Sequence, residues 1–133
     1  MIDFDNEVYT IVRNAVKEQY PNCYITSKSE NIPTQFPAVA FSFMSNVVYN
    51  KTRDTGSNEN HVAVAYQTDV FSNDKVSPIS ECKAIMSVVD DTLLNLGFSR
   101  NFYEKIPNGE SNITRLTARH RAVFDKNGTI YRR

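Results

Sequence analysis

Two stretches of the chain carry apolar residues at three- and four-residue spacing, which predicts two helices that each bury one face. The first stretch lies before Pro21, which ends a helix because proline has no amide donor and restricts the residue before it. We therefore expect a helix from about Asp3 to Gln19. Its apolar stripe comprises Phe4, Val8, Ile11, Val12 and Val16.

The second stretch begins at Ser77 and Pro78 and ends at Gly97. Ser77 is expected to cap the free amides, and Pro78 suits the first helical position. Gly97 supplies the left-handed residue that closes many helices. We expect this helix to lie across a sheet. Its buried stripe is predicted to comprise Ile79, Cys82, Ile85, Met86, Val89, Leu93 and Leu96.

Alternation with a period of two predicts strands in most of the remaining chain. One face of the segment 62–70 comprises Val62, Val64, Tyr66, Thr68 and Val70. From residue 38 onward, towards Tyr49, large and small side chains alternate, with Val39, Phe41 and Phe43 on one face and Ala38, Ala40 and Ser42 on the other. The small residues allow close packing against a helix or a neighbouring subunit. Further strands are expected at residues 23–26, 99–106 and 113–124.

Residues 50–60, with the sequence NKTRDTGSNEN, have no apolar anchor. Burial cannot hold such a segment in place, so we predict a mobile loop that joins two long antiparallel strands and becomes ordered on assembly. The complete pattern predicts an α+β fold: a mostly antiparallel sheet with an N-terminal helix, a second helix packed across it, and a long β-hairpin with a mobile loop. The 133 residues fit a single domain, residues 1–133.

Charge gives the chain no global preference for a partner. The 15 basic and 15 acidic residues cancel, so no overall field attracts DNA or an acidic membrane surface. No segment approaches the roughly 20 apolar residues that a membrane span needs. The C-terminal part is nevertheless basic. From residue 113 to the end, Asp125 is the only acidic residue, whereas six residues are basic: Arg115, Arg119, Arg121, Lys126, Arg132 and Arg133.

The nucleophilic and basic side chains form no recognisable catalytic pattern. Cys23 and Cys82 have no zinc-site spacing, and free thiols in a reducing cytoplasm are the expected state. Neither His61 nor His120 is close to a cysteine in sequence, and no glycine-flanked nucleophile elbow exists. We therefore expect no enzyme and no cofactor.

The acidic residues give no stronger signal. Asp90 and Asp91 are adjacent on the second helix, so their side chains point about 100° apart and are expected on a solvated face. A metal site formed by His61 with Glu59 and Asp54 would place every ligand in a flexible loop without a recognised spacing. No metal site is predicted.

The alternation of Arg115, Arg119 and Arg121 with core residues is more informative. It places three guanidinium groups on one face of a single strand, while Leu116, Ala118, Ala122 and Phe124 face the core. Three interpretations are open: a solvated face with cross-strand salt bridges, an inter-subunit contact to carboxylates, or a contact with a nucleic acid backbone. The last lacks interleaved aromatic residues for base stacking.

Four stretches of the sequence resemble the tail-completion or tail-terminator proteins of long-tailed bacteriophages and Gram-positive prophages, which are minor tail or neck proteins. They are IDFDNEVYTIV at residues 2–12, SECKAIMSVVDDTLLNLGF at 80–98, ITRLTARHRAVFD at 113–125 and GTIYRR at 128–133. The resemblance spans most of the chain. It implies a structural virion protein whose subunits form a ring, commonly a hexamer, that caps the tail tube and joins it to the head connector.

The resemblance implies three partners: other copies of the chain, the tail-tube protein and the head-connector or neck protein. DNA would only pass through the ring, no membrane would be involved, and assembly would take place in the cytoplasm of the bacterial host. A head-closure or other neck connector role is an alternative, as is a nucleic-acid-binding module that uses the basic C-terminal strand. Inter-subunit or partner contacts are expected from Arg115, Arg119, Arg121, Lys51, Arg53, Asp54 and Glu59.

Overall fold

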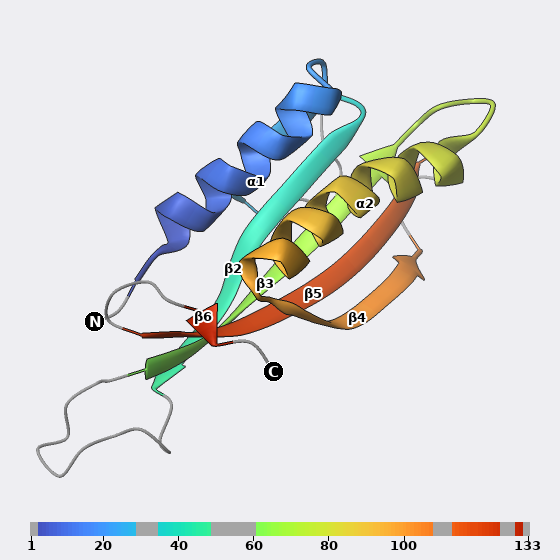
Figure 1. The fold of residues 1–133 in the computed structure, drawn as a ribbon. Helices are drawn as coiled ribbons and strands as arrows, with labels where there is room; N and C mark the ends of the chain where they lie inside the picture. Colours follow the sequence, from blue (N-terminus) through green and yellow to red (C-terminus); the bar gives the residue numbers. More distant parts are fainter. Residues whose placement is uncertain (1–2, 29–34, 49–60, 108–112, 126–129, 132–133) are drawn as a thin grey trace, which may run out of the picture.

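Both helices lie on the same face of one sheet, so the described part of the chain has two layers (Figure 1). The computed structural model describes residues 3–28, 35–48, 61–107, 113–125 and 130–131. In chain order the elements are α1 (Asp5–Gln19), β1 (Tyr24–Thr26), β2 (Ala38–Val48), β3 (His61–Ser72), α2 (Pro78–Leu96), β4 (Ser99–Ile106), β5 (Thr114–Asp125) and β6 (Ile130–Tyr131). The predicted α+β class is confirmed.

The strands follow the order β1-β2-β3-β5-β4, and the two-residue β6 also pairs with β5. The pairs β2–β3, β3–β5 and β5–β4 are antiparallel, which confirms the mostly antiparallel sheet and the long β2–β3 hairpin. Strand β1 runs parallel to β2 and covers only residues Ala38 to Ala40. The last long strand, β5, therefore lies inside the sheet between β3 and β4.

The core lies between the helices and the facing side chains of β2, β3 and β5. The predicted alternation of β3 is confirmed, since Val62, Val64, Tyr66, Thr68 and Val70 are all buried. An aromatic cluster fills the centre of this layer: the rings of Phe41 and Tyr66 stack at 5.0 Å, and Phe98 contacts Tyr66 at 5.9 Å. The Tyr66 hydroxyl also donates a hydrogen bond to Asp5, which connects the start of α1 to the sheet.

Helix α1 presents a narrower buried face than its sequence predicts. Val8, Val12 and Val16 are buried, but Ile11 is exposed because it lies about 100° around the helix from Val12. The helix also begins at Asp5, two residues later than predicted, and the Asp5 amide donates to the Asp3 carboxylate at 2.9 Å.

Helix α2 follows its predicted boundaries with two differences at the N-terminal end. Pro78 occupies the first turn as expected, but the Ser77 side chain makes no capping hydrogen bond. Ile79 is exposed because it projects beside the sheet towards β4 instead of into the core. At the other end, Gly97 has φ of 108° and its amide donates to Leu94, which confirms the left-handed cap.

Replacement of Leu93 by alanine should lower the free energy of unfolding by about 2–5 kcal/mol, because this side chain of α2 is completely buried in the core. The matched control is Leu94→Ala, one residue further along and 42% exposed, which should change stability by about 0.5 kcal/mol or less. Urea unfolding monitored by circular dichroism measures both. Equal losses from the two variants would contradict the placement of the helix.

Candidate assembly surface

The sheet face opposite the helices, here called the open face, carries the arginines of β5. Leu116, Ala118, Ala122 and Phe124 are buried on the helix side, as predicted. By alternation, Arg115, Arg119 and Arg121 lie on the open face together with Thr117, and no described helix covers this face (Figure 1). The prediction of three guanidinium groups on one face is confirmed.

A completely buried carboxylate organises the middle of the open face. Asp69 on β3 lies directly opposite Thr117 on β5, and the Thr117 hydroxyl donates to its Oδ1. Arg115 Nε donates to the same oxygen at 3.1 Å, and Gln67 Nε2 donates to Oδ2 at 3.1 Å. These donors compensate the carboxylate for its lost hydration, so the ion pair with Arg115 belongs to the folded structure of the subunit itself.

Both Arg115 and Arg119 have further partners within the chain. The Arg115 guanidinium lies 5.4 Å from the centroid of the Phe71 ring. Arg119 Nε donates to Gln67 Oε1 at 3.1 Å, and its guanidinium lies 4.8 Å from the centroid of the Phe102 ring on β4. The cross-strand salt bridge that one interpretation expects is confirmed for Arg115, whereas Arg119 bonds to a neutral amide and remains exposed.

Arg121 differs from the other two arginines. It lies opposite Ala65 on β3 and Ser99 on β4, and neither of these side chains is charged. Arg121 is exposed, and it forms no ion pair or hydrogen bond with another described residue. Among the three arginines, its charge is therefore the most accessible to another molecule.

The remaining predicted contact residues belong to the segment 50–60. Lys51, Arg53, Asp54 and Glu59 lie outside the described residues, as does the predicted mobile loop itself. Their proposed contacts therefore stay predictions.

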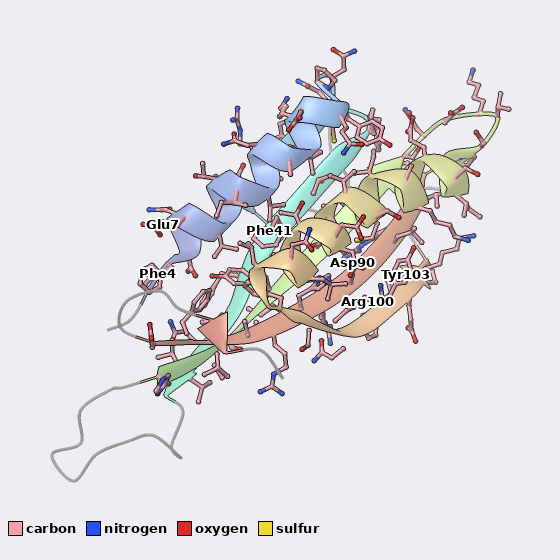
Figure 2. All side chains as sticks on the ribbon, viewed as in Figure 1. Phe4, Glu7, Phe41, Asp90, Arg100 and Tyr103 are labelled. Atoms are coloured by element: carbon pink, nitrogen blue, oxygen red, sulfur yellow. The ribbon has the colours of Figure 1, made fainter. Side chains whose placement is uncertain are left out.

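A second polar cluster, which the sequence does not predict, lies on the helix side of the sheet. His120 on β5 is completely buried, and its Nε2 lies 2.8 Å from Asp90 Oδ1 on α2. Arg100 on β4 donates to the other oxygen of Asp90 at 3.0 Å, and Figure 2 shows the two side chains facing each other. The expected solvated face is thus wrong for Asp90, which is mostly buried, and right for Asp91, which is exposed.

The sequence does contain a signal for this cluster. His120 stands in the core-facing register of β5, between Ala118 and Ala122, and Asp90 lies four residues after the buried Met86 and three before the buried Leu93. Burial lowers the pKa of His120, and the hydrogen bond with Asp90 opposes this only in part. His120 is therefore neutral at neutral pH, and its Nε2 proton is available to the carboxylate.

The two thiols are inert. Cys23 and Cys82 are buried and free, and burial raises the pKa of Cys23 to about 11 and the pKa of Cys82 to about 12. Both side chains are protonated at neutral pH, and Cys82 lies within 3.6 Å of the Val70 and Thr114 carbonyl oxygens. The thiolate needed for nucleophilic attack is absent at these positions.

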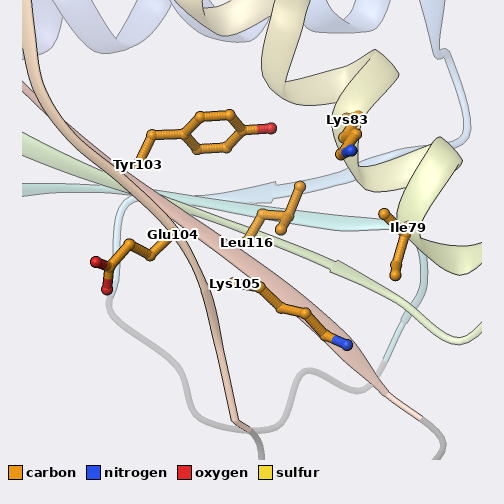
Figure 3. A pocket seen from close by; sticks show the side chains of 6 residues that line it. All are labelled: Ile79, Lys83, Tyr103, Glu104, Lys105 and Leu116. Carbon is orange, nitrogen blue, oxygen red and sulfur yellow. The ribbon is translucent and has the colours of Figure 1, made fainter.

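A cavity of about 280 Å³ lies between the start of α2 and the outer strand β4 (Figure 3). Its apolar walls come from Ile79, Tyr103 and Leu116, and the chains of Lys83 and Lys105 flank it with Glu104. Its volume lies just below the range typical of small-molecule sites.

Within the residues that the structure describes, no group of three histidine, cysteine or carboxylate side chains gathers as a metal site would require. Neither described helix combines the length and the apolar character needed to cross a bilayer.

No protein-family description and no curated protein matches the sequence. The fold does match solved structures. One is a chain of the virion of a native gene transfer agent (GTA) particle, which superposes with a TM-score of 0.60 at 13% sequence identity. The match covers 87% of this chain and 90% of the other chain. At this identity the likeness establishes a shared fold across nearly the whole of both chains.

Replacement of Arg115 by alanine should lower the free energy of unfolding by about 3 kcal/mol, because it leaves the Asp69 carboxylate buried without its cation. Arg121→Ala, on the same strand and face, is the matched control and should change stability by about 0.5 kcal/mol or less. Urea denaturation measures both. If the Arg121 variant lost as much stability as the Arg115 variant, the assignment of partners would be wrong.

The stability of the protein should fall as the pH decreases below about 7, in part because of His120. The unfolded chain binds a proton at this residue near its ordinary pKa of 6.5, while the folded chain does so only at lower pH. Unfolding free energies measured between about pH 7.5 and 5.5 should therefore have a smaller pH slope in His120→Gln than in the unmodified protein. An unchanged slope would contradict the role of His120.

Proposed function

We propose that this chain is a non-enzymatic structural protein of a virion. The observation that supports this most directly is the fold match to a chain of a gene transfer agent virion, which extends over almost the full length of both chains. Cys23 and Cys82 are both kept in the unreactive thiol form. In keeping with this, the described polar clusters serve to pair strands and to connect a helix to the sheet.

Within this class, we infer a tail-completion or tail-terminator role. The basis is the resemblance of residues 2–12, 80–98, 113–125 and 128–133 to such proteins, together with the helix-sheet arrangement that the structure has in common with the virion chain. Single-domain subunits would form a ring, expected to be a hexamer, with one face complementary to the end of a tail tube. The other face would meet the head connector. Capping stops polymerisation because the ring offers the tube no further subunit surface.

The geometry of the open face ranks the three arginines by how available their charge is to another subunit. The charge of Arg115 is neutralised by Asp69 inside the subunit, so this residue supports an interface mainly by shaping the strand. Arg119 is exposed but stacked on Phe102, and Arg121 has no such partner among the described side chains. We therefore propose Arg121 as the principal arginine contact to a carboxylate of another subunit or of a partner.

The same engagement of Arg115 and Arg119 weakens the nucleic-acid alternative. A phosphate backbone is bound by several free cations, and each contact contributes to a steep loss of affinity with added salt. Two of the three arginines on this face have partners within the chain. We expect weak or absent binding to DNA, and tight binding that falls steeply with salt would favour the alternative.

The decisive experiment combines the purified chain with tail tubes assembled from a major tail protein. Light scattering gives the mass of the assembly, and electron microscopy shows its symmetry and position. We expect a six-fold ring at one end of the tube. A ring that binds the head connector but not tubes would instead favour head closure, and a persistent monomer that ignores both would overturn the proposal.

Arg121→Glu should reduce ring formation without lowering the unfolding free energy, because a carboxylate partner would then meet a like charge. Arg13→Glu, an equally exposed arginine on α1, is the matched control and should assemble normally. Sedimentation velocity of the two variants gives the comparison. Normal assembly of the Arg121 variant would remove this residue from the interface.

A further inference from the structure

Among the described strands, none pairs with the outer edge of β2 along most of its length. Strand β2 has 11 residues, and β1 pairs only with Ala38 to Ala40. Beyond Ala40, the backbone of β2 therefore has no partner strand within the described part of the chain on the side away from β3. Such an edge is a template for pairing with another strand.

The side chains of β2 do not protect this edge. Proteins usually guard an open edge with charged residues or prolines, and β2 has neither. Instead it exposes three large apolar residues: Phe43 at 50%, Met44 at 43% and Val47 at 58%. The one protective feature is a register shift between Phe43 and Ser45. The edge has the composition of a surface that is covered in an assembly.

The opposite edge of the same sheet, β4, has the matching direction and length. Strand β4 has eight residues and pairs only with β5 among the described strands. Three antiparallel steps separate β2 from β4, so the two edge strands run in opposite directions. If two copies are placed side by side in the same orientation, β2 of one copy meets β4 of the next as an antiparallel pair.

The exposed aromatic side chain of one edge and the cavity at the other edge lie on the same face of the sheet. Phe43 lies on the helix side of the sheet, where its ring contacts Tyr66 at a centroid distance of 6.3 Å. The cavity beside β4 lies on the same side, between that strand and α2, and is lined by Ile79, Tyr103 and Leu116 (Figure 3). In a sheet that continues from one copy to the next, an exposed aromatic ring therefore faces a mainly apolar cavity with room to admit it.

We propose that β2 of one copy adds to β4 of a second copy, so that the sheet continues between subunits and Phe43 enters the cavity beside β4. This inference deepens the proposed function and rests on its ring of identical subunits. A head-to-tail contact of this kind forms a ring when the rotation between successive copies closes, and both edges are then covered. A two-fold β2–β2 contact would cover only one edge and leave the cavity empty.

Cysteine cross-linking of mixed single variants tests the pairing. Antiparallel pairing with Phe43 opposite Tyr103 brings Val47 opposite Ser99, and both residues are exposed. A mixture of Val47→Cys and Ser99→Cys, treated with a short bismaleimide, should give a covalent dimer. The native Cys23 and Cys82 are buried, so neither is expected to react in the folded protein. Leu94→Cys, exposed on α2, replaces Val47→Cys in the control mixture and should give none.

A second pair of variants tests the edge by assembly. Val47→Lys places a charge on the open edge and should abolish association, whereas Leu94→Lys adds the same charge to α2 and should leave association intact. Equal thermal unfolding of the two variants by circular dichroism keeps a folding defect separate from an interface defect.

The outcomes separate this inference from the proposed function. A ring that forms without the 47–99 cross-link, or a Val47→Cys protein that cross-links efficiently to itself, would overturn the edge pairing and leave the terminator role standing. Cross-linked head-to-tail assemblies that bind neither tubes nor head connectors would support the pairing and overturn the terminator role. A chain that stays monomeric at all concentrations and in the presence of tubes would overturn both.

Discussion

The in-register pairing of β3 with β5 is the constraint on which both faces of the molecule depend. It aligns the two strands from His61–Asp125 to Ser72–Thr114 without a shift. On one side this register places Tyr66 and Val70 under the helices, and on the other it places Asp69 opposite Thr117. A slip by one residue would exchange the faces, putting a carboxylate into the core and aromatic rings into solvent. The core and the Asp69 cluster therefore enforce the same alignment.

The elements that sequence patterns predict well are those whose pattern is long and regular. Strand β4 has its predicted boundaries, and α2 and β3 differ from theirs by little, because alternation or helical spacing continues over many residues. The residues that were wrongly predicted to be buried lie where an element turns away from its neighbours. Ile11 and Ile79 are apolar and correctly spaced, but whether the sheet extends beneath them depends on the packing of the whole layer.

The candidate surface was predictable only in its outline. Alternation correctly placed Arg115, Arg119 and Arg121 on one face, but not the partner of each, because Asp69 lies 46 positions before Arg115 in the chain. The Asp90–His120 contact spans 30 positions and depends on how α2 crosses the sheet. Local spacing can place Asp90 and His120 on core-facing positions of their own elements, but it contains no information on which residue each one meets. The open β2 edge likewise emerges only from strand order.

Asp90 has a mechanical consequence, since one of its carboxylate oxygens contacts β5 through His120 and the other contacts β4 through Arg100. The outermost strand is thus fastened to the helix above it as well as to its neighbour in the sheet. Separation of β4 from the sheet would break the Arg100–Asp90 ion pair as well as the β4–β5 backbone hydrogen bonds. The carboxylate and the imidazole are positioned by the core itself, so this contact between the edge strand and α2 forms when the core packs.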